Sequence, residues 1–153
     1  MTYEEVRRDP AVQVYIAQAD ASMQALGFTE HSFAHVTRVA KTAGDILETL
    51  GYPARTVELA RIAGYLHDIG NVVNRVDHSQ SGAVMAFRSL DRMNFPPEEI
   101  ASIVTAIGNH DEGTGLPVSA IAAALILADK SDVRRSRVRD KAKVALDIHD
   151  RVN

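Results

Sequence analysis

Adjacent histidine and aspartate residues, His67 and Asp68, end an apolar segment and are followed at once by Ile69 and Gly70. The segment is predicted to be a helix with one buried face, because its apolar residues recur at helical spacing: Leu59, Ile62, Ala63 and Leu66. Gly70 is predicted to stop the helix in the left-handed conformation. Imidazole and carboxylate are common ligands of divalent ions. A single His-Asp pair at a helix end is usually only a hydrogen-bonded cap. A metal site therefore requires further ligands from elsewhere in the chain.

Three other segments supply such ligands. His35 lies beside Val36 in an apolar stripe predicted to run from Phe33 to Leu50. His110 continues the stripe formed by Ile103 and Ile107. Asp129 continues a further stripe through Ile121 and Leu125. A carboxylate on an apolar face is costly unless it is paired or bound to a metal. Each residue alone would be read as a satisfied core group, but together they indicate one metal site between helices.

The order of these residues resembles a known family. His35, then Leu66-His67-Asp68-Ile69-Gly70, then Ala128-Asp129 is similar to the H…HD…D signature of the HD superfamily of metal-dependent phosphohydrolases, over about residues 29–138. The resemblance implies that one divalent ion is held by His35, His67, Asp68 and Asp129. It also implies hydrolysis of a phosphate ester by a metal-activated water, with His67 and Asp68 at the catalytic centre.

Two further stretches resemble the two-metal members of this superfamily. His78 is followed by Gly82, as in their His-x-x-x-Gly, and the stretch 109–117 is similar to a shortened form of the His-His-Glu…Asp-Gly-x-Gly-Tyr-Pro motif of the cyclic-dinucleotide-cleaving subfamily. This resemblance implies a second ion held by His78, His110 and a bridging Asp68. The sequence departs from the subfamily pattern at Asn71, Asn109 and Leu116, so cleavage of cyclic di-GMP is not assigned.

The expected cofactor is one or two divalent metal ions. A ligand set of nitrogen and oxygen, rich in histidine, favours manganese, iron, zinc or nickel over magnesium alone.

Basic residues near the candidate ligands could hold phosphate. Lys130 directly follows Asp129, and Arg134 lies one helical turn beyond it, so both are predicted to contact the substrate phosphate. Arg38, one turn beyond His35, is a further candidate. His31 is expected to be exposed or to lie behind the ligands, with a contact to substrate left open as the alternative, and His149 receives no role.

The elements that must position these residues are all helical, because no segment alternates in the manner of a strand. The first predicted helix covers residues 10–26, and the second is capped by Thr29 and ends at residue 50. The third covers 53–68, the fourth 78–93, the fifth 97 to about 110, and the sixth 118 to the mid-130s. In the fourth of these, Val84, Phe87 and Leu90 are predicted to face inward. Residues 139–153 remain unassigned between helix and tail. The sequence therefore predicts an all-α fold, a compact single-domain bundle of about six helices over residues 1–153.

Composition limits the function classes. The chain has 153 residues, no cysteine and a net charge of −3; from Lys130 to Lys143 seven basic residues stand against two acidic ones, which gives +5 and leaves −8 elsewhere. Disulfides and thiolate chemistry are excluded. No secretory signal or long apolar run is visible, so a cytoplasmic protein without a membrane segment is expected. The acidic remainder argues against general nucleic-acid binding and favours a small anionic substrate.

The leading prediction is a phosphohydrolase or phosphodiesterase acting on a nucleotide or another small phosphorylated molecule. Two alternatives stay open: a di-iron oxygenase, and a non-catalytic, metal-stabilised nucleotide-sensing module. The sequence does not decide the substrate, the metal, the number of ions, the native C-terminus or the oligomeric state, with a homo-oligomer among the options.

Overall fold

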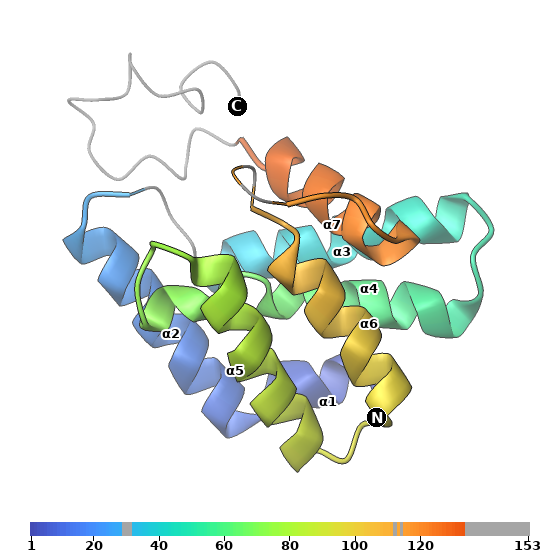
Figure 1. Ribbon diagram of the computed structural model, residues 1–153, viewed down its shortest axis with the longest axis horizontal. Coiled ribbons are helices and arrows are strands. Elements are labelled where there is room, and N and C mark those ends of the chain that lie inside the picture. The colour runs from blue at the N-terminus through green and yellow to red at the C-terminus, as the bar shows by residue number, and fades with distance from the viewer. Residues whose placement is uncertain (29–31, 112, 114, 134–153) are drawn as a thin grey trace.

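The structure is a computed structural model that describes residues 1–28, 32–111, 113 and 115–133 (Figure 1). The elements, in chain order, are α1 (Tyr3–Arg8), α2 (Pro10–Ala25), α3 (Phe33–Thr49), α4 (Ala54–Leu66), the short 3₁₀ helix η1 (Ile69–Val72), α5 (His78–Arg92), α6 (Pro97–Gly108) and α7 (Ala120–Ser131). Within the described ranges there is no strand. The predicted all-α class is therefore confirmed.

The pair α3 and α4 forms the centre of the fold, with α7 packed against both (Figure 1). The two helices can approach closely because α4 carries Gly64, where a Cβ atom would lie 2.7 Å from the Cα of Ala40 on α3. Gly51, with φ of 84°, follows α3 and allows the chain to reverse before α4, as the sequence predicts. This close packing brings the start of α3 beside the end of α4.

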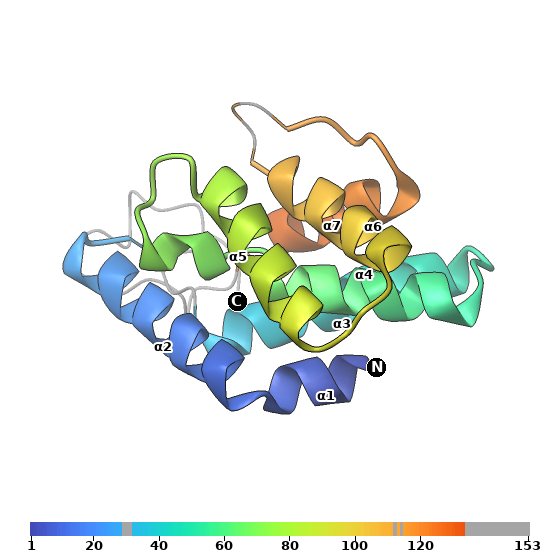
Figure 2. The same cartoon turned by 60° about the horizontal axis from the view of Figure 1, so that its bottom comes forward.

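The remaining helices enclose this centre. Helix α6 packs against α4, α5 and α7, while α5 and α2 both pack against η1. Figure 2 shows α1 and α2 together along the lower side of the molecule, with α1 against α4. Buried Val, Ile, Leu and Ala side chains from all seven α-helices form one hydrophobic core. The compact helical bundle is thus confirmed, and a single domain over residues 1–153 stays a prediction.

One helix escaped the sequence prediction. Helix α1 has only six residues, and its start is fixed by Thr2 and Glu5, which bond reciprocally in a capping box. So short a helix leaves too few residues for a periodic pattern, although the capping box itself is visible in the sequence.

The inward face predicted for α5 is partly wrong. Val84 and Phe87 are 69% and 51% exposed, whereas Leu90 is buried. The buried face instead includes Gly82 and Ala86, because small side chains let α5 approach η1 and α6. The buried face of α5 is therefore determined by how closely its backbone approaches η1 and α6, and not by the hydrophobicity of its side chains.

Several other boundaries differ. Helix α7 ends at Ser131, earlier than predicted, and Phe33 and Leu50 at the two ends of the α3 stripe are exposed. The predicted cap at Thr29 and the segment 139–153 lie outside the described residues. No helix in the part of the chain that the structure describes is long and apolar enough to cross a membrane.

Candidate metal centre

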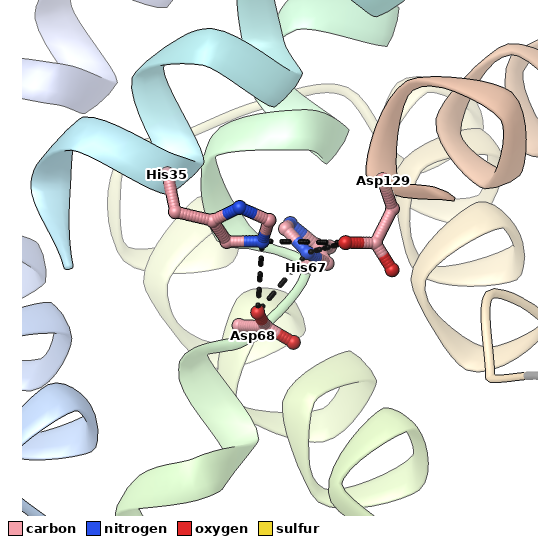
Figure 3. Close-up of side chains that lie close together, drawn as sticks. All are labelled: His35, His67, Asp68 and Asp129. Carbon is pink, nitrogen blue, oxygen red and sulfur yellow. Dashed lines mark ion pairs between the residues drawn. The ribbon is translucent and has the colours of Figure 1, made fainter. Parts of the chain in front are cut away.

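Four side chains from three helical segments point toward one another inside the bundle (Figure 3). The Nε2 atom of His35 lies 3.4 Å from Oδ2 of Asp68 and 3.2 Å from Oδ1 of Asp129. The Nε2 atom of His67 lies 3.2 Å and 3.3 Å from the same two oxygens. His35, His67 and Asp68 are buried, and Asp129 is partly buried. The structure thus brings together all four residues of the predicted first group.

Element ends position these side chains. His35 is in the first turn of α3, His67 is the residue that caps the C-terminus of α4, and Asp129 is in the last turn of α7. Asp68 follows His67 and precedes η1. Because these ends meet where α3, α4 and α7 pack together, residues far apart in sequence share one site.

Gly70 contributes to this arrangement differently from the prediction. Its φ is not positive, so the expected left-handed helix stop is wrong. A Cβ atom at this position would instead overlap the carbonyl oxygen of His78 and lie 2.5 Å from the backbone nitrogen of Gly82. The glycine therefore lets α5 approach the segment that carries Asp68.

A second group shares Asp68 with the first. Oδ1 of Asp68 lies 3.5 Å from Nε2 of His78 and 3.7 Å from Nε2 of His110, while Oδ2 faces His35 and His67. Both added histidines are buried. The two oxygens of one carboxylate therefore face two separate pairs of imidazoles, an arrangement that suits a bridging ligand.

Every one of the four imidazoles has its Nδ1 atom next to an oxygen. The acceptors are the Asp132 carboxylate for His35 (2.7 Å) and the carbonyls of Gly64 for His67 (2.7 Å), Arg75 for His78 (3.1 Å) and Ile107 for His110 (2.6 Å). A carbonyl oxygen can only accept, so Nδ1 must donate in the last three. In the neutral imidazoles the lone pair then sits on Nε2, which is the atom directed into the cluster.

The contact between His78 and His110 brings together two ring nitrogens that carry lone pairs in the neutral imidazoles. Their Nε2 atoms lie 3.1 Å apart, yet both Nδ1 atoms donate to carbonyls. Burial lowers the pKa of His78 to about 4, with Arg75 and His110 acting in the same direction and Asp68 opposing them. If both imidazoles are neutral they present two lone pairs to each other, and a proton or a metal ion between the two nitrogens removes this repulsion.

Electrostatics in the first group also favour a cation. Burial disfavours the charged form of His35, but hydrogen bonding to Asp129, Asp132 and Asp68 outweighs it and raises its pKa to about 9. Burial opposes protonation of His67 as well, and Asp68 and Asp129 still raise its pKa well above the usual value. Burial likewise works against the charged form of Asp129, but His67 and His35 hold its pKa well below the ordinary range. The carboxylates thus attract positive charge, either as protons or as a metal ion.

The residues fit a divalent ion. The two carboxylates of the first group carry two negative charges, and its two imidazoles can each offer a neutral nitrogen. Atoms bound to one ion at about 2.1 Å lie about 3.0–3.4 Å from each other, close to the 3.2–3.4 Å separations across this group. Nε2 of His67 is fully buried and, among the described residues, makes no hydrogen bond with acceptable geometry. A metal ion would satisfy it.

Sequence analysis missed Asp132. This residue lies directly after α7, is 2% exposed, and holds His35 from behind. A carboxylate on the far nitrogen of a ligating histidine fixes the ring and raises its basicity. Its spacing of three from Asp129 is the available signal, but the basic residues around Asp132 give it the pattern of an exposed surface charge.

The predicted phosphate contacts are only partly described. Lys130 lines a cavity of about 350 Å³ together with His110, Asp111, Gly115, Pro117, Ala123, Ile126 and Leu127. Arg38 is 55% exposed and lies 3.9 Å from Asp132, behind His35 rather than beside the ligating nitrogens. Arg134, His31 and His149 lie outside the described residues.

Comparison with known proteins agrees with the geometry. The chain is 27% identical to the uncharacterized protein MJ1020 of Methanocaldococcus jannaschii, in a match that covers 97% of this chain and 66% of that protein, just under two thirds of its length. It also resembles the crystal structure of a predicted HD superfamily hydrolase from an uncultured Thermotogales bacterium, with a TM-score of 0.62, 27% identity, and coverage of 86% of this chain and 73% of the other. The family model of the HD domain matches residues 32–151. The chain therefore belongs to the HD domain family.

Proposed function

We propose that this protein is a divalent-metal-dependent phosphohydrolase, either a phosphomonoesterase or a phosphodiesterase, that acts on a nucleotide or another small phosphorylated molecule. The observation that carries the proposal is the convergence of His35, His67, Asp68 and Asp129 in one cluster. Membership of the HD domain family and the likeness to a predicted HD superfamily hydrolase support the same chemistry.

The residues in the two groups would hold the metal. We assign one ion to the four residues of the first group, and a second ion to His78, His110 and the shared Asp68. A bound divalent ion lowers the pKa of water toward neutrality and polarises a phosphoryl oxygen. The nitrogen and oxygen donors support manganese, iron, zinc or nickel over magnesium alone.

The protein's own contribution is orientation. Asp132 and the carbonyl of Gly64 fix the rings of His35 and His67, and the carbonyls of Arg75 and Ile107 fix the other two rings. These bonds keep the four Nε2 atoms directed inward, so little rearrangement is needed when metal binds. Lys130, on the wall of the adjoining cavity, is suited to neutralise a substrate phosphate.

The cavity beside His110 supports a small organic substrate. Pro117, Ala123, Ile126 and Leu127 form apolar walls, and the cavity volume of about 350 Å³ is within the range of small-molecule sites. A base, sugar or other compact group could occupy it while the phosphate lies at the metal. Outside the segment 130–143 the chain carries −8, which favours such substrates over nucleic acid.

Hydrolysis of phosphate esters tests the proposal, measured by phosphate release for monoesters and by chromatography of the product nucleotides for cyclic substrates. The manganese-loaded protein is assayed against nucleoside mono-, di- and triphosphates, cyclic nucleotides and p-nitrophenyl phosphate. We expect His35→Ala and Asp129→Ala to abolish turnover while circular dichroism remains helical, and Asp91→Ala, on the exposed end of α5, to behave as wild type. Oxygen consumption without hydrolysis of any phosphate ester would support a di-iron oxygenase instead. Tight nucleotide binding without turnover would support a sensing module.

A further inference from the structure

Arg75 extends toward the proposed ligand cluster from the loop between η1 and α5. Its Nη1 atom lies 4.0 Å from Oδ1 of Asp68, the oxygen that faces His78 and His110. The side chain is one-third exposed, and its guanidinium carbon lies 5.8 Å from the ring centre of Phe28. The positively charged guanidinium of Arg75 thus lies between solvent and the second group of ligands.

Asn71 holds this guanidinium in place. The Arg75 Nη1 atom donates to Oδ1 of Asn71 at 3.4 Å, and Asn71 is 1% exposed. Among the described residues, the Nδ2 group of Asn71 has no hydrogen-bond partner. An unpaired buried donor of this kind is costly. The guanidinium, held by the Asn71 carbonyl, therefore presents its donors beside Asp68, where they are suited to an acceptor-rich ligand.

The charge of Arg75 points to the kind of ligand. With metal on Oδ1 of Asp68, as proposed above, the negative charge nearest to the guanidinium is already neutralised. A guanidinium beside a metal ion is unfavourable when no anion balances the two positive charges. An anion that contacts both the guanidinium and the metal ion removes this repulsion. The planar fork of arginine matches the oxygens of a phosphoryl group.

The backbone and side chain of Arg75 have separable roles. Its carbonyl oxygen accepts from Nδ1 of His78 at 3.1 Å and from the backbone nitrogen of His78 at 3.2 Å. These bonds orient a ligating ring and do not depend on the side chain. A substitution at Arg75 can therefore remove the guanidinium while keeping the support of His78.

We propose that Arg75, held by Asn71 and Phe28, binds the phosphoryl oxygens of the substrate on the His78–His110 side of the centre. The inference rests on the proposed function for the identity of the anion. It assigns the residue a contact with substrate, whereas Asn71 acts as a positioning residue through Arg75.

Phosphate binding tests the inference directly. Inorganic phosphate is titrated by calorimetry into manganese-loaded wild type, Arg75→Met and Arg75→Lys, with Arg88→Met, an exposed arginine on α5, as the matched control. Because a hydrogen bond to a charged group contributes substantially, we expect Arg75→Met to weaken phosphate affinity about tenfold or more. Arg75→Lys should retain part of the affinity, Arg88→Met should match wild type, and manganese affinity without phosphate should not fall in any variant.

A double-mutant cycle tests the role of Asn71. If Asn71 acts through Arg75, Asn71→Leu weakens phosphate binding in wild type but adds little to Arg75→Met. Equal effects in both backgrounds would overturn the positioning role.

The outcomes separate the inference from the proposed function. Three results would overturn the inference, even if the protein hydrolyses phosphate esters. They are a wild-type phosphate affinity in Arg75→Met, no phosphate binding by the manganese-loaded wild type, and a loss of manganese affinity in Arg75→Met as large as its loss of phosphate affinity. Loss of phosphate binding in Arg75→Met, in a protein that turns over no phosphate ester, would support the inference and remove the proposed function.

Discussion

Asp132 accepts a hydrogen bond from Nδ1 of His35 at 2.7 Å, although the two residues are 97 positions apart in the chain. Asp132 is 2% exposed, so the carboxylate is withdrawn from solvent and directed at the ring. The bond connects the segment after α7 to the first turn of α3. It places a buried anion behind a proposed metal ligand.

Removal of this anion should weaken metal binding. We expect Asp132→Ala to reduce manganese affinity about 10–100-fold, because the His35 ring loses both its orientation and the carboxylate that raises its basicity. Calorimetric titration with manganese measures the effect. Asp45→Ala, which removes an exposed α3 carboxylate paired with Lys41, should leave the affinity unchanged. Equal affinities in Asp132→Ala and wild type would show that Asp132 does not support the site.

Gly70→Ala should destabilise the fold. The new methyl group would overlap the His78 carbonyl and lie 2.5 Å from the Gly82 nitrogen, so α5 must shift away from η1. Overpacking of this kind costs about 1–3 kcal/mol, measured by urea unfolding. Gly108→Ala is the matched control, since its Cβ atom would meet Ala83 at an ordinary 3.7 Å at the end of α6. A Gly70→Ala variant as stable as wild type would contradict the close packing.

Asp9 should make stability depend on pH. Its carboxylate accepts from Arg92 at 2.6 Å and from the backbone nitrogen of Val12 at 3.0 Å as the N-cap of α2. The bond from Arg92 is the largest influence, and with the bond from Val12 it lowers the pKa of Asp9 despite partial burial. Because the folded pKa lies below the unfolded value of about 3.9, the stabilisation is present above that value and is lost as the pH falls through the folded pKa.

Unfolding of Asp9→Ala measures this contribution. At pH 7 the variant should be less stable than wild type by about 1 kcal/mol, the typical cost of a lost N-cap. The difference should shrink as the pH is lowered from 4 toward 2.5. Asp9→Asn, which keeps a capping oxygen without the charge, should show a smaller difference and less pH dependence. A pH-independent gap for Asp9→Ala would assign its effect to something other than the ionised carboxylate.

Filling the cavity beside His110 should discriminate among substrates. Ala123→Leu places a larger side chain on the cavity wall, so KM should rise about tenfold for a substrate with a bulky organic group and little for a compact phosphoester. Steady-state kinetics on both substrates give the ratio. Ala101→Leu, which alters a different surface on α6, should change neither KM. A uniform change for both substrates at Ala123 would place the organic group elsewhere.

The proposed ligands could be predicted because each has a distinctive residue type at a distinctive spacing. His67 and Asp68 end an apolar stripe, and His35 and Asp129 lie at the ends of helices that must pack against it. Their convergence follows from burying the apolar faces of α3, α4 and α7 together.

The groups that orient the ligands could not be predicted in the same way. Three of the four imidazoles donate to backbone carbonyls three residues earlier, at Gly64, Arg75 and Ile107. Two of these carbonyls belong to the last turns of α4 and α6, where carbonyls lack partners within the helix. Any residue type supplies a carbonyl, so the sequence carries no sign of the acceptor.

The errors on α5 have a related cause. Val84 and Phe87 fit an apolar stripe, but the helix turns Gly82 and Ala86 inward. Hydrophobicity alone does not encode how closely two backbones approach, and here that distance decides the face.

Metal analysis of the purified protein, after saturation with manganese and removal of free ion, is the most direct test of the central claim that the imidazoles and carboxylates of this bundle hold metal. Inductively coupled plasma mass spectrometry should give about two ions per chain for wild type and about one for His78→Ala, since His78 belongs only to the second group. A wild-type protein that retains no stoichiometric metal would contradict the claim.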